Sequence, residues 1–240
     1  MELTKENLKY TLDICKEISD TMIGCNEIQF KRIHHYFHHI MLYIKDYIMK
    51  ENCKNYLEIG SYTGHSLSTI LQSKYKSKFM GIDIFKSWGD GENMNLEKIT
   101  NDNIKKFNKY NYQVNIYKGN STHNNTLNKV KEYFPDGIDL LFIDGDHSYK
   151  GILNDFELYF PLVNKNGYIV FDDYLPYKAG NGNDRGAPKA INEIINKYNN
   201  QIKNIGLTDD VLEIYKIKNN KPKYDNGNIP KNIDYIIQKK

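Results

Sequence analysis

The sequence predicts an α/β protein with a doubly wound sheet of seven strands, mostly parallel, with an antiparallel C-terminal strand pair and helices at the N-terminus. Two observations lead to this fold class. Between residues 55 and 198, short apolar stretches alternate with longer amphipathic segments, which is the pattern of βαβ units in a parallel sheet. After residue 198, two apolar stretches flank Asp209 and Asp210, as in two strands joined by a tight turn.

The composition fits one globular domain. The chain has 240 residues, of which 40% are hydrophobic and 26% charged, enough to bury a core. No apolar stretch reaches the roughly 18 residues of a membrane span, and the first ten residues mix both charges, so we expect neither a membrane helix nor a secretory signal. The unrelated spacing of Cys15, Cys25 and Cys53 predicts three reduced thiols in a cytoplasmic protein.

The charge pattern argues against nucleic-acid binding. Acidic residues (30) nearly match basic ones (33), giving a net charge of +3. Only Arg32 and Arg185 are arginines, and the lysines are scattered along the chain rather than clustered, as they would be in a nucleic-acid-binding face. The abundance of Lys, Asn, Ile and Tyr indicates an AT-rich source genome, that of a bacterium or a large DNA virus.

Residues 1–50 are expected to form two helices. Apolar residues recur with helical period from Leu8 to Ile18 and again from Ile33 to Ile48, and residues 22–26 break the pattern. The second helix holds four histidines, but no cysteine or acidic third ligand is spaced beside them, so we expect a polar helix face or a lid rather than a zinc site. These histidines are His34, His35, His38 and His39. The whole segment is interpreted as a lid or an oligomer contact.

The remaining elements follow in order. The expected strands are residues 56–59, 79–84, 113–117, 138–143, 167–171, 202–207 and 211–217, and the expected helices are residues 66–72, 96–110, 121–133, 149–162 and 189–198. Residues 138–143 are almost wholly apolar, as in a strand buried on both faces. Polar, glycine-containing loops occupy residues 86–95 and 176–188. The core is predicted over residues 51–218, followed by a polar tail over residues 219–240.

The first motif, Glu58 to Ser66, joins the first strand to the next helix. Gly60 and Gly64 allow a tight turn and close approach of a ligand to the backbone. The spacing is Gly-x-x-x-Gly rather than Gly-x-Gly-x-x-Gly, which argues against a dinucleotide cofactor. A simple turn is the alternative interpretation.

Two further motifs follow the second and third strands. Asp83 ends the second strand and could accept hydrogen bonds from both hydroxyls of a ribose. Gly119-Asn120-Ser121 follows the third strand and could read an adenine edge, with a plain turn as the alternative. Because the carboxyl ends of parallel strands meet at one edge of a sheet, these motifs together predict a nucleoside site.

Three aspartates end the fourth and fifth strands. Asp144 follows the fourth strand, and Asp172 and Asp173 follow the fifth. Since neighbouring strands lie about 4.8 Å apart, the three carboxylates should converge, and a hard divalent cation would relieve their repulsion. Capping of helices or turns is the alternative role.

The segments LEIGSYTGHS, GIDIF, KGNS and FIDGDHSYKGILNDFELYFPLVNKNGYIVFDDY resemble the class I S-adenosylmethionine-dependent methyltransferases, which have a Rossmann-like fold. Within them, they are most similar to the metal-dependent small-molecule O-methyltransferases, which include catechol, caffeoyl-CoA, macrolide-sugar and cephalosporin-tailoring enzymes. The resemblance covers residues 55–217, about two-thirds of the chain.

The resemblance implies roles for individual residues. Glu58, Gly60, Ser61 and Ser66 match the methionine-binding turn, Asp83 the ribose acid, Asn120 and Ser121 the adenine-side loop, and Asp144, Asp172 and Asp173 the metal ligands. Asp144 would also act in catalysis through the metal, for which Mg²⁺ is the expected ion. The sequence departs from the catechol enzymes twice. His147 replaces a catalytic lysine, and Asp173 replaces an asparagine ligand.

The motifs and the resemblance therefore predict an O-methyltransferase that uses S-adenosylmethionine and a divalent metal to methylate a small hydroxylated acceptor, and the resemblance to the macrolide-sugar enzymes implies a sugar or sugar nucleotide. His147 is the expected general base, because an imidazole can take a proton at neutral pH; capping of the helix after it is the alternative. Two other functions stay open: an N-methyltransferase or nucleic-acid methyltransferase, and a catalytically silent nucleoside-binding scaffold. Gly180, Gly182 and Gly186 suggest a lid over the acceptor, and Trp88 could stack on it.

Overall fold

The computed structural model describes residues 5–24, 38–86, 94–174, 186–207 and 234–240. The described helices are α1 (Lys5–Thr21), α2 (His39–Tyr43), α3 (His65–Ile70), α4 (Leu96–Phe107), α5 (Asn124–Tyr133), α6 (Tyr149–Tyr159) and α7 (Ala187–Lys197). The strands are β1 (Asn55–Ile59), β2 (Lys78–Asp83), β3 (Gln113–Lys118), β4 (Ile138–Ile143), β5 (Val163–Phe171), β6 (Ile202–Leu207) and β7 (Tyr235–Lys239). A π-helical turn, Ile44–Met49, continues α2. No described helix combines the length and the apolar character that a membrane span needs.

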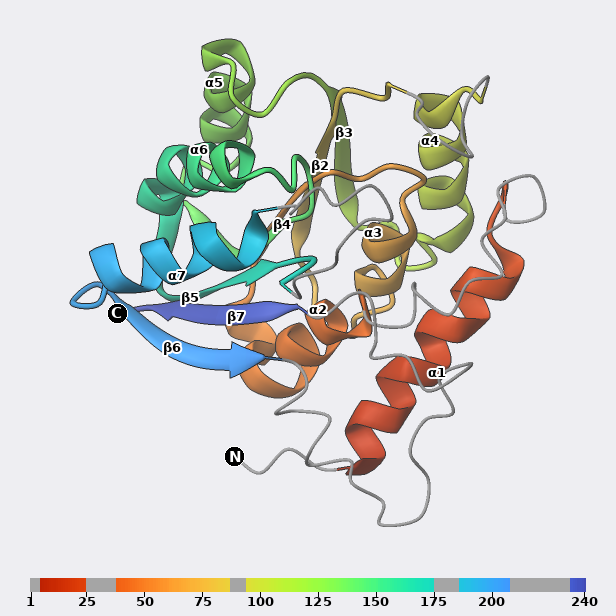
Figure 1. The fold of residues 1–240 in the computed structure, drawn as a ribbon. Helices are drawn as coiled ribbons and strands as arrows, with labels where there is room; N and C mark the ends of the chain where they lie inside the picture. The colour runs from red at the N-terminus through yellow and green to blue at the C-terminus, as the bar shows by residue number, and fades with distance from the viewer. Residues whose placement is uncertain (1–4, 25–37, 87–93, 175–185, 208–233) are drawn as a thin grey trace, which may run out of the picture.

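The seven strands form one mixed sheet in the order β3-β2-β1-β4-β5-β7-β6, which confirms the predicted fold class (Figure 1). Strands β1 to β5 are parallel, whereas β7 pairs antiparallel with both β5 and β6. From β1 the chain builds the sheet in one direction through β2 and β3, and from β4 it builds in the other. In such sheets, ligands bind where the direction switches, beyond the carboxyl ends of the strands, which here means the ends of β1 and β4.

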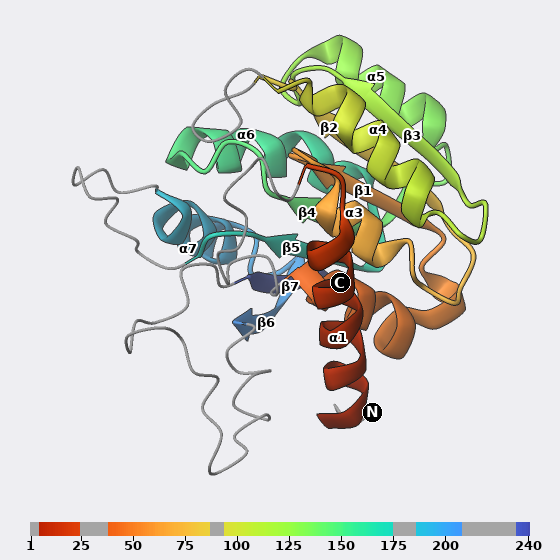
Figure 2. The same cartoon turned by 90° about the vertical axis from the view of Figure 1, so that its right-hand side faces the viewer.

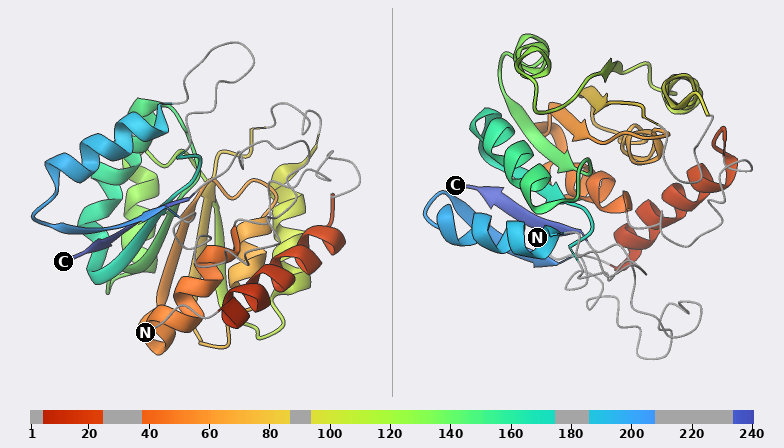
Figure 3. Two further views of the ribbon diagram at one scale, coloured as in Figure 1. Left: turned by 60° about the horizontal axis from the view of Figure 1, so that its bottom comes forward. Right: turned by 45° about the horizontal axis from the view of Figure 1, so that its top comes forward.

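Helices cover both faces of the sheet (Figures 1 and 3). One face packs against α5, α6 and α7, and the other against α2, α3 and α4. Along β1, Leu57 and Ile59 belong to the first apolar cluster and Tyr56 to the second, so the strand is buried on both sides. This double burial explains why the central strands are so apolar in sequence.

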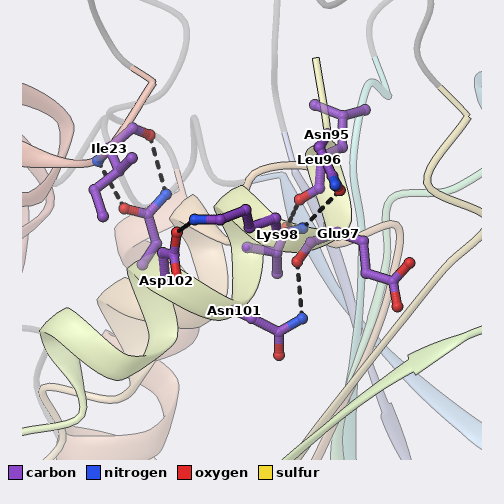
Figure 4. Close-up of polar contacts among 9 residues, drawn as sticks. Ile23, Asn95, Leu96, Glu97, Lys98, Asn101 and Asp102 are labelled. Carbon is purple, nitrogen blue, oxygen red and sulfur yellow. Dashed lines mark hydrogen bonds and ion pairs between the residues drawn. The ribbon is translucent and has the colours of Figure 1, made fainter.

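Helix α1 lies outermost, against α2 and α3 (Figure 2). Its apolar stripe is buried, as Leu8 and Cys15 show, and it ends at Thr21, next to the predicted break. Figure 4 shows the following turn beside α4, where Ile23 forms two hydrogen bonds with the Asn103 side chain, at 2.7 and 3.2 Å. Asn103 also donates to the carbonyl of Thr63 at 2.9 Å. The N-terminal segment is thus tied to the turn after β1.

The histidine prediction was wrong for two of its four residues. His38 and His39 are buried rather than on a polar helix face, with 7% and 5% of their surface exposed. His39 Nδ1 lies 3.0 Å from the Thr11 hydroxyl of α1. Packing of α1 over α2 buries positions that, in the sequence, flank the apolar stripe. His34 and His35 lie outside the described residues.

The C-terminal boundary was also misplaced. The strand predicted at residues 211–217 lies outside the described residues, whereas β7 falls inside the predicted polar tail. Tyr235, Ile236 and Ile237 are buried, and Lys239 Nζ donates to the carbonyls of Phe160 (3.0 Å) and Val163 (2.7 Å). The five-residue strand lies among Lys and Asn residues in the sequence. Because the segment is polar on average, its few apolar residues did not indicate a strand.

Candidate functional site

A cavity of about 1160 Å³ opens beyond the carboxyl ends of β1, β2, β4 and β5. Most of the predicted site residues line it. From the cofactor motifs these are Gly60, Ser61, Ser66, Asp83, Asn120 and Ser121, and from the other motifs Asp144, His147, Asp172 and Asp173. The topological switch thus brings residues that are more than 100 positions apart into one cavity.

The turn after β1 is built by glycines with left-handed backbones. Gly60 (φ +94°) donates its N–H to the Ile82 carbonyl at 2.8 Å, and Gly64 (φ +78°) precedes α3. A Cβ on Gly60 would lie 2.0 Å from the Asp144 carbonyl oxygen. The turn therefore needs glycine at position 60 for both conformation and space.

Glu58 supports this turn from the core. Its side chain is fully buried, and its Oε2 accepts a hydrogen bond from the Tyr56 hydroxyl at 2.7 Å. Burial raises the pKa of Glu58 to about 7, although the hydroxyls of Tyr56, Ser66 and Ser61 oppose that shift. Glu58 is not among the described residues that line the cavity. It therefore acts on the turn rather than at the cavity wall.

Asp83 is held by the backbone at the end of β2. One carboxylate oxygen accepts the Tyr62 N–H at 2.7 Å and the other the Phe85 N–H at 2.6 Å. Both donors are in non-glycine residues with positive φ, 45° for Tyr62 and 48° for Phe85. Each oxygen keeps a further lone pair, so the fixed carboxylate can still accept hydrogen bonds from a diol.

The loop after β3 is a turn that also faces the cavity. Asn120 Oδ1 accepts hydrogen bonds from the Thr122 N–H (2.9 Å) and hydroxyl (2.8 Å). The Ser121 carbonyl accepts one from the Tyr159 hydroxyl at 2.7 Å, which anchors the loop to α6. The loop therefore forms the predicted turn and also lines the cavity. The Asn120 amide nitrogen and the Ser121 hydroxyl are groups that could contact a base.

The three predicted carboxylates meet at the ends of β4 and β5. Ile143 pairs with Phe171 across these strands, which places Asp144 beside Asp172. Burial, followed by the charges of Asp172 and Asp173, raises the pKa of Asp144 well above its usual range. Burial alone would raise the pKa of Asp172, but the charges of His38 and His147 lower it. These shifts come from the crowding of carboxyl groups in a buried space next to two histidines.

His147 lies between two of these carboxylates. Its Nε2 is 3.5 Å from Asp144 Oδ1, and its Nδ1 is 3.6 Å from Asp173 Oδ2. The capping alternative for this histidine is excluded, because Ser148 is the N-cap of α6 and its hydroxyl accepts the Gly151 N–H at 3.0 Å. The imidazole retains 17% exposure, so it is accessible from the cavity.

Two residues at the site were missed in the sequence. His38 lines the cavity, and one of its ring nitrogens lies within 4.8 Å of oxygens of Asp144 and Asp172. Asp234 is fully buried, and burial together with the charge of the neighbouring Asp172 raises its pKa well above its usual range. Asp234 precedes Tyr235, which pairs with Phe171, so antiparallel pairing of β7 with β5 is the signal that would have located it.

The carboxylate group fits a divalent cation. Asp172 Oδ1 is buried, and within the described part of the chain it accepts no hydrogen bond, which is costly for a charged oxygen unless a cation is nearby. Oxygen ligands from three carboxylates suit Mg²⁺ or Mn²⁺. The predicted lid lies mostly outside the described residues, as do Trp88, Gly180 and Gly182.

Comparison with known proteins agrees with this geometry. Residues 57–174 match a family model described as a methyltransferase domain. The chain is 39% identical over 156 residues to "Uncharacterized protein R132" of Acanthamoeba polyphaga mimivirus, a match that covers 63% of this chain and 65% of the viral protein, just under two thirds.

Two solved structures share the fold. One is an O-methyltransferase from Bacillus cereus in complex with S-adenosylhomocysteine (TM-score 0.56, 13% identity, 100% of this chain and 93% of that one). The other is CalS11, a TDP-rhamnose 3'-O-methyltransferase of calicheamicin biosynthesis (TM-score 0.50, 15% identity, 85% and 92%). The fold, the switch-point cavity and the family match agree: residues 57–174, just under half of the chain, are similar to a methyltransferase domain and include most of the residues that line the cavity.

Proposed function

We propose that this protein transfers a methyl group from S-adenosylmethionine to an oxygen of a small hydroxylated molecule, with the help of a divalent metal. One observation carries the proposal. The same cavity is lined by the predicted cofactor-binding residues and by two predicted metal ligands. These are Gly60, Asp83 and Asn120 for the cofactor and Asp144 and Asp172 for the metal. A methyl donor and a metal-bound acceptor would therefore be neighbours.

On the cofactor side, the chain's task is binding and orientation. Asp83, fixed by two backbone donors, would accept hydrogen bonds from the ribose hydroxyls. Asn120 and Ser121 would contact the adenine, and the turn at Gly60 would admit the methionine moiety close to the backbone. S-adenosylmethionine supplies a methyl group that is already activated on a sulfonium. Alignment of the acceptor with it can contribute on the order of 7–11 kcal/mol.

On the acceptor side, Asp144, Asp172 and Asp173 would hold the divalent ion, whose chemistry is to lower the pKa of a bound hydroxyl. His147 would take the proton of that hydroxyl, because it lies within 3.6 Å of two of these carboxylates and is open to the cavity. The carboxylates orient the imidazole for this step.

The acceptor is proposed to be a polyol such as a sugar or sugar nucleotide. Two features support an oxygen acceptor: metal-type carboxylates suit a chelating diol rather than an amine, and CalS11 methylates TDP-rhamnose. The cavity is also open, with a volume of about 1160 Å³. An open cavity favours a catalytic site over a silent scaffold whose cleft is filled by side chains.

The test is methyl transfer from S-adenosylmethionine labelled in its methyl group. We expect transfer to at least one member of a panel of nucleotide sugars and catechols, complete loss of transfer after exhaustive chelation, and recovery with Mg²⁺ or Mn²⁺. Transfer only to amines or to nucleic acid, or full turnover without metal, would contradict the proposal.

Cofactor binding is tested separately from turnover. Asp83→Asn should weaken S-adenosylmethionine binding at least ~10-fold, because each hydrogen bond to a charged acceptor contributes about 1.5–3 kcal/mol. Asp102→Asn is the matched control, since Asp102 pairs with Lys98 on the exposed face of α4. Equal affinities in calorimetry for both variants would remove Asp83 from the site.

A further inference from the structure

His38 belongs to the wall of the catalytic cavity although it lies 19 residues before the matched methyltransferase domain. It immediately precedes α2. Its ring packs edge-on against Phe142 of β4, with centroids 5.6 Å apart, and lies 5.7 Å from the ring of His65. With 7% of its surface exposed, the imidazole has a defined position, which is a property of metal ligands rather than of mobile surface histidines.

The His38 ring points toward the carboxylates of Asp144 and Asp172, which are proposed to hold the metal ion. One His38 nitrogen and single oxygens of Asp144 and Asp172 all lie within 4.8 Å of one another. A divalent first-row ion binds such nitrogen and oxygen atoms at about 2.0–2.2 Å, so ligands of one ion are about 3–4 Å apart. Small side-chain rotations would bring these three atoms to that spacing.

A second, independent observation points to an ion at this place. Asp172 is common to both groups of potential ligands in the described structure, the other being His147, Asp172 and Asp173. Its Oδ1 is buried, and none of the described residues donates a hydrogen bond to it. A buried carboxylate oxygen in this state is expected to have a cation as its partner.

The two histidines are suited to different roles. His147 follows β4 and keeps 17% of its side chain exposed next to Asp144 and Asp173, where it can reach an acceptor. His38 is more deeply buried and comes from the helical segment on one face of the sheet. An imidazole held this way can bind a metal but has less access to the acceptor.

We propose that a ring nitrogen of His38 is a ligand of the divalent ion held by Asp144 and Asp172. The inference deepens the proposed function and rests on its metal. The centre is then a mixed nitrogen and oxygen site rather than a purely carboxylate one. Since imidazole favours Mn²⁺, Fe²⁺, Co²⁺ and Zn²⁺ relative to Mg²⁺, the protein should bind Mn²⁺ and Co²⁺ much more tightly than Mg²⁺. The N-terminal segment also becomes part of the metal site.

The experiment titrates the full-length protein with Mn²⁺ alone and follows electron paramagnetic resonance. Free Mn²⁺ gives the affinity, and pulsed spectra of bound Mn²⁺ report coordinated nitrogen. We expect a nitrogen coupling in the wild type. In His38→Asn this coupling should disappear, and Mn²⁺ affinity should fall at least ~10-fold.

Three comparisons make the result specific. His39→Gln is the matched control, because His39 is equally buried but contacts Thr11 of α1, and it should keep both coupling and affinity. His147→Asn should keep the nitrogen coupling. His38→Cys should give a thiolate-to-metal absorption band with Co²⁺, which a merely structural histidine position would not produce. Calorimetry with S-adenosylmethionine shows that each variant is folded.

The outcomes separate this inference from the function on which it rests. A wild type that binds Mn²⁺ with the same nitrogen coupling in His38→Asn overturns the role of His38 and leaves the metal-assisted function intact. Loss of the coupling in His147→Asn alone does the same and assigns the nitrogen to His147. A wild type that binds S-adenosylmethionine but no Mn²⁺ overturns both the inference and the metal part of the proposed function.

Discussion

Gly60 and Asp144 approach so closely that a Cβ on Gly60 would lie 2.0 Å from the Asp144 carbonyl oxygen and 2.8 Å from the Gly145 nitrogen. This contact joins the turn after β1, which is proposed to bind the cofactor, to the end of β4, which is proposed to bind the metal. Asp144 N–H also donates to the Ile59 carbonyl at 2.8 Å. The two halves of the cavity therefore share one rigid backbone junction.

Gly60→Ala should disrupt this junction. The substitution combines a backbone clash, which costs about 1–3 kcal/mol, with a left-handed backbone, which costs about 1–2 kcal/mol. We expect the free energy of unfolding to fall by about 2–5 kcal/mol in urea titrations. Gly145→Ala is the control, because its Cβ would approach Ile59 Cγ2 to 3.2 Å and Asp155 Oδ2 to 3.5 Å, without a backbone clash; equal stability of the two variants would refute the argument.

Glu58 should make the protein less stable as pH rises. Its pKa is raised from 4.5 to about 7 in the folded state by burial, so the stabilisation is fully present below pH 4.5 and is lost as pH rises through 7. Each unit corresponds to 1.36 kcal/mol, which gives a loss of about 3 kcal/mol. Glu58→Gln, which can still accept from Tyr56, should lack this loss.

The measurement is urea unfolding of both proteins at several pH values between 4.5 and 8. Asp155, whose pKa is raised to about 6 by burial, contributes equally to both, so only their difference reports Glu58. The exposed Glu132→Gln serves as control, since Glu132 pairs with Lys129 at the surface. Parallel pH dependences of the wild type and Glu58→Gln would show that Glu58 ionises normally.

Strand β7 should be essential for folding. A chain that ends at residue 233 lacks Tyr235, Ile236 and Ile237, which are buried between β5 and β6. Burial of each side chain contributes about 1.5–3 kcal/mol, and the total approaches the whole stability of a typical domain. We expect no cooperative thermal transition, whereas a chain that lacks only Lys240 should melt normally. Cooperative melting of the chain ending at 233 would contradict the assigned role of β7.

His147 should matter for turnover rather than for cofactor binding. As the proposed general base, it should contribute about 10²–10⁴-fold to the rate, so His147→Ala should lose that factor in kcat. The affinity for S-adenosylmethionine should change less than ~2-fold, and added imidazole should restore part of the rate. His123→Ala is the control, because His123 is exposed. Near-normal turnover of His147→Ala would leave activation of the hydroxyl to the metal alone.

The central part of the fold was predictable from the sequence because its signals are local. Strands β4 and β6 have the predicted bounds, and β4 is recognisable because burial on both faces requires an apolar run. The switch point then follows from the βαβ order, and it brings the predicted residues Asp83, Asn120 and Asp144 to one cavity. For these residues, the side-chain chemistry and the position at the end of a strand were sufficient to predict that they line the cavity.

His38, Asp234 and β7 were not predictable in the same way, because tertiary pairing decides their environments. His38 is buried only because α1 and α2 pack over the sheet, and a histidine in a polar-looking stretch carries no local sign of this. Asp234 reaches Asp172 only because β7 enters the sheet antiparallel between β5 and β6. The three apolar residues of β7 lie among Lys and Asn residues and show no alternation of apolar and polar side chains that would indicate a strand.

The central claim is that the methyl donor and the metal occupy one cavity. It is tested most directly by a crystal structure of the protein with S-adenosylhomocysteine and Mn²⁺, using the anomalous signal of manganese. The account predicts ribose hydroxyls on Asp83, adenine beside Asn120, and one manganese peak bound by Asp144 and Asp172. Manganese absent from these carboxylates, or a nucleoside bound away from Asp83, would contradict it.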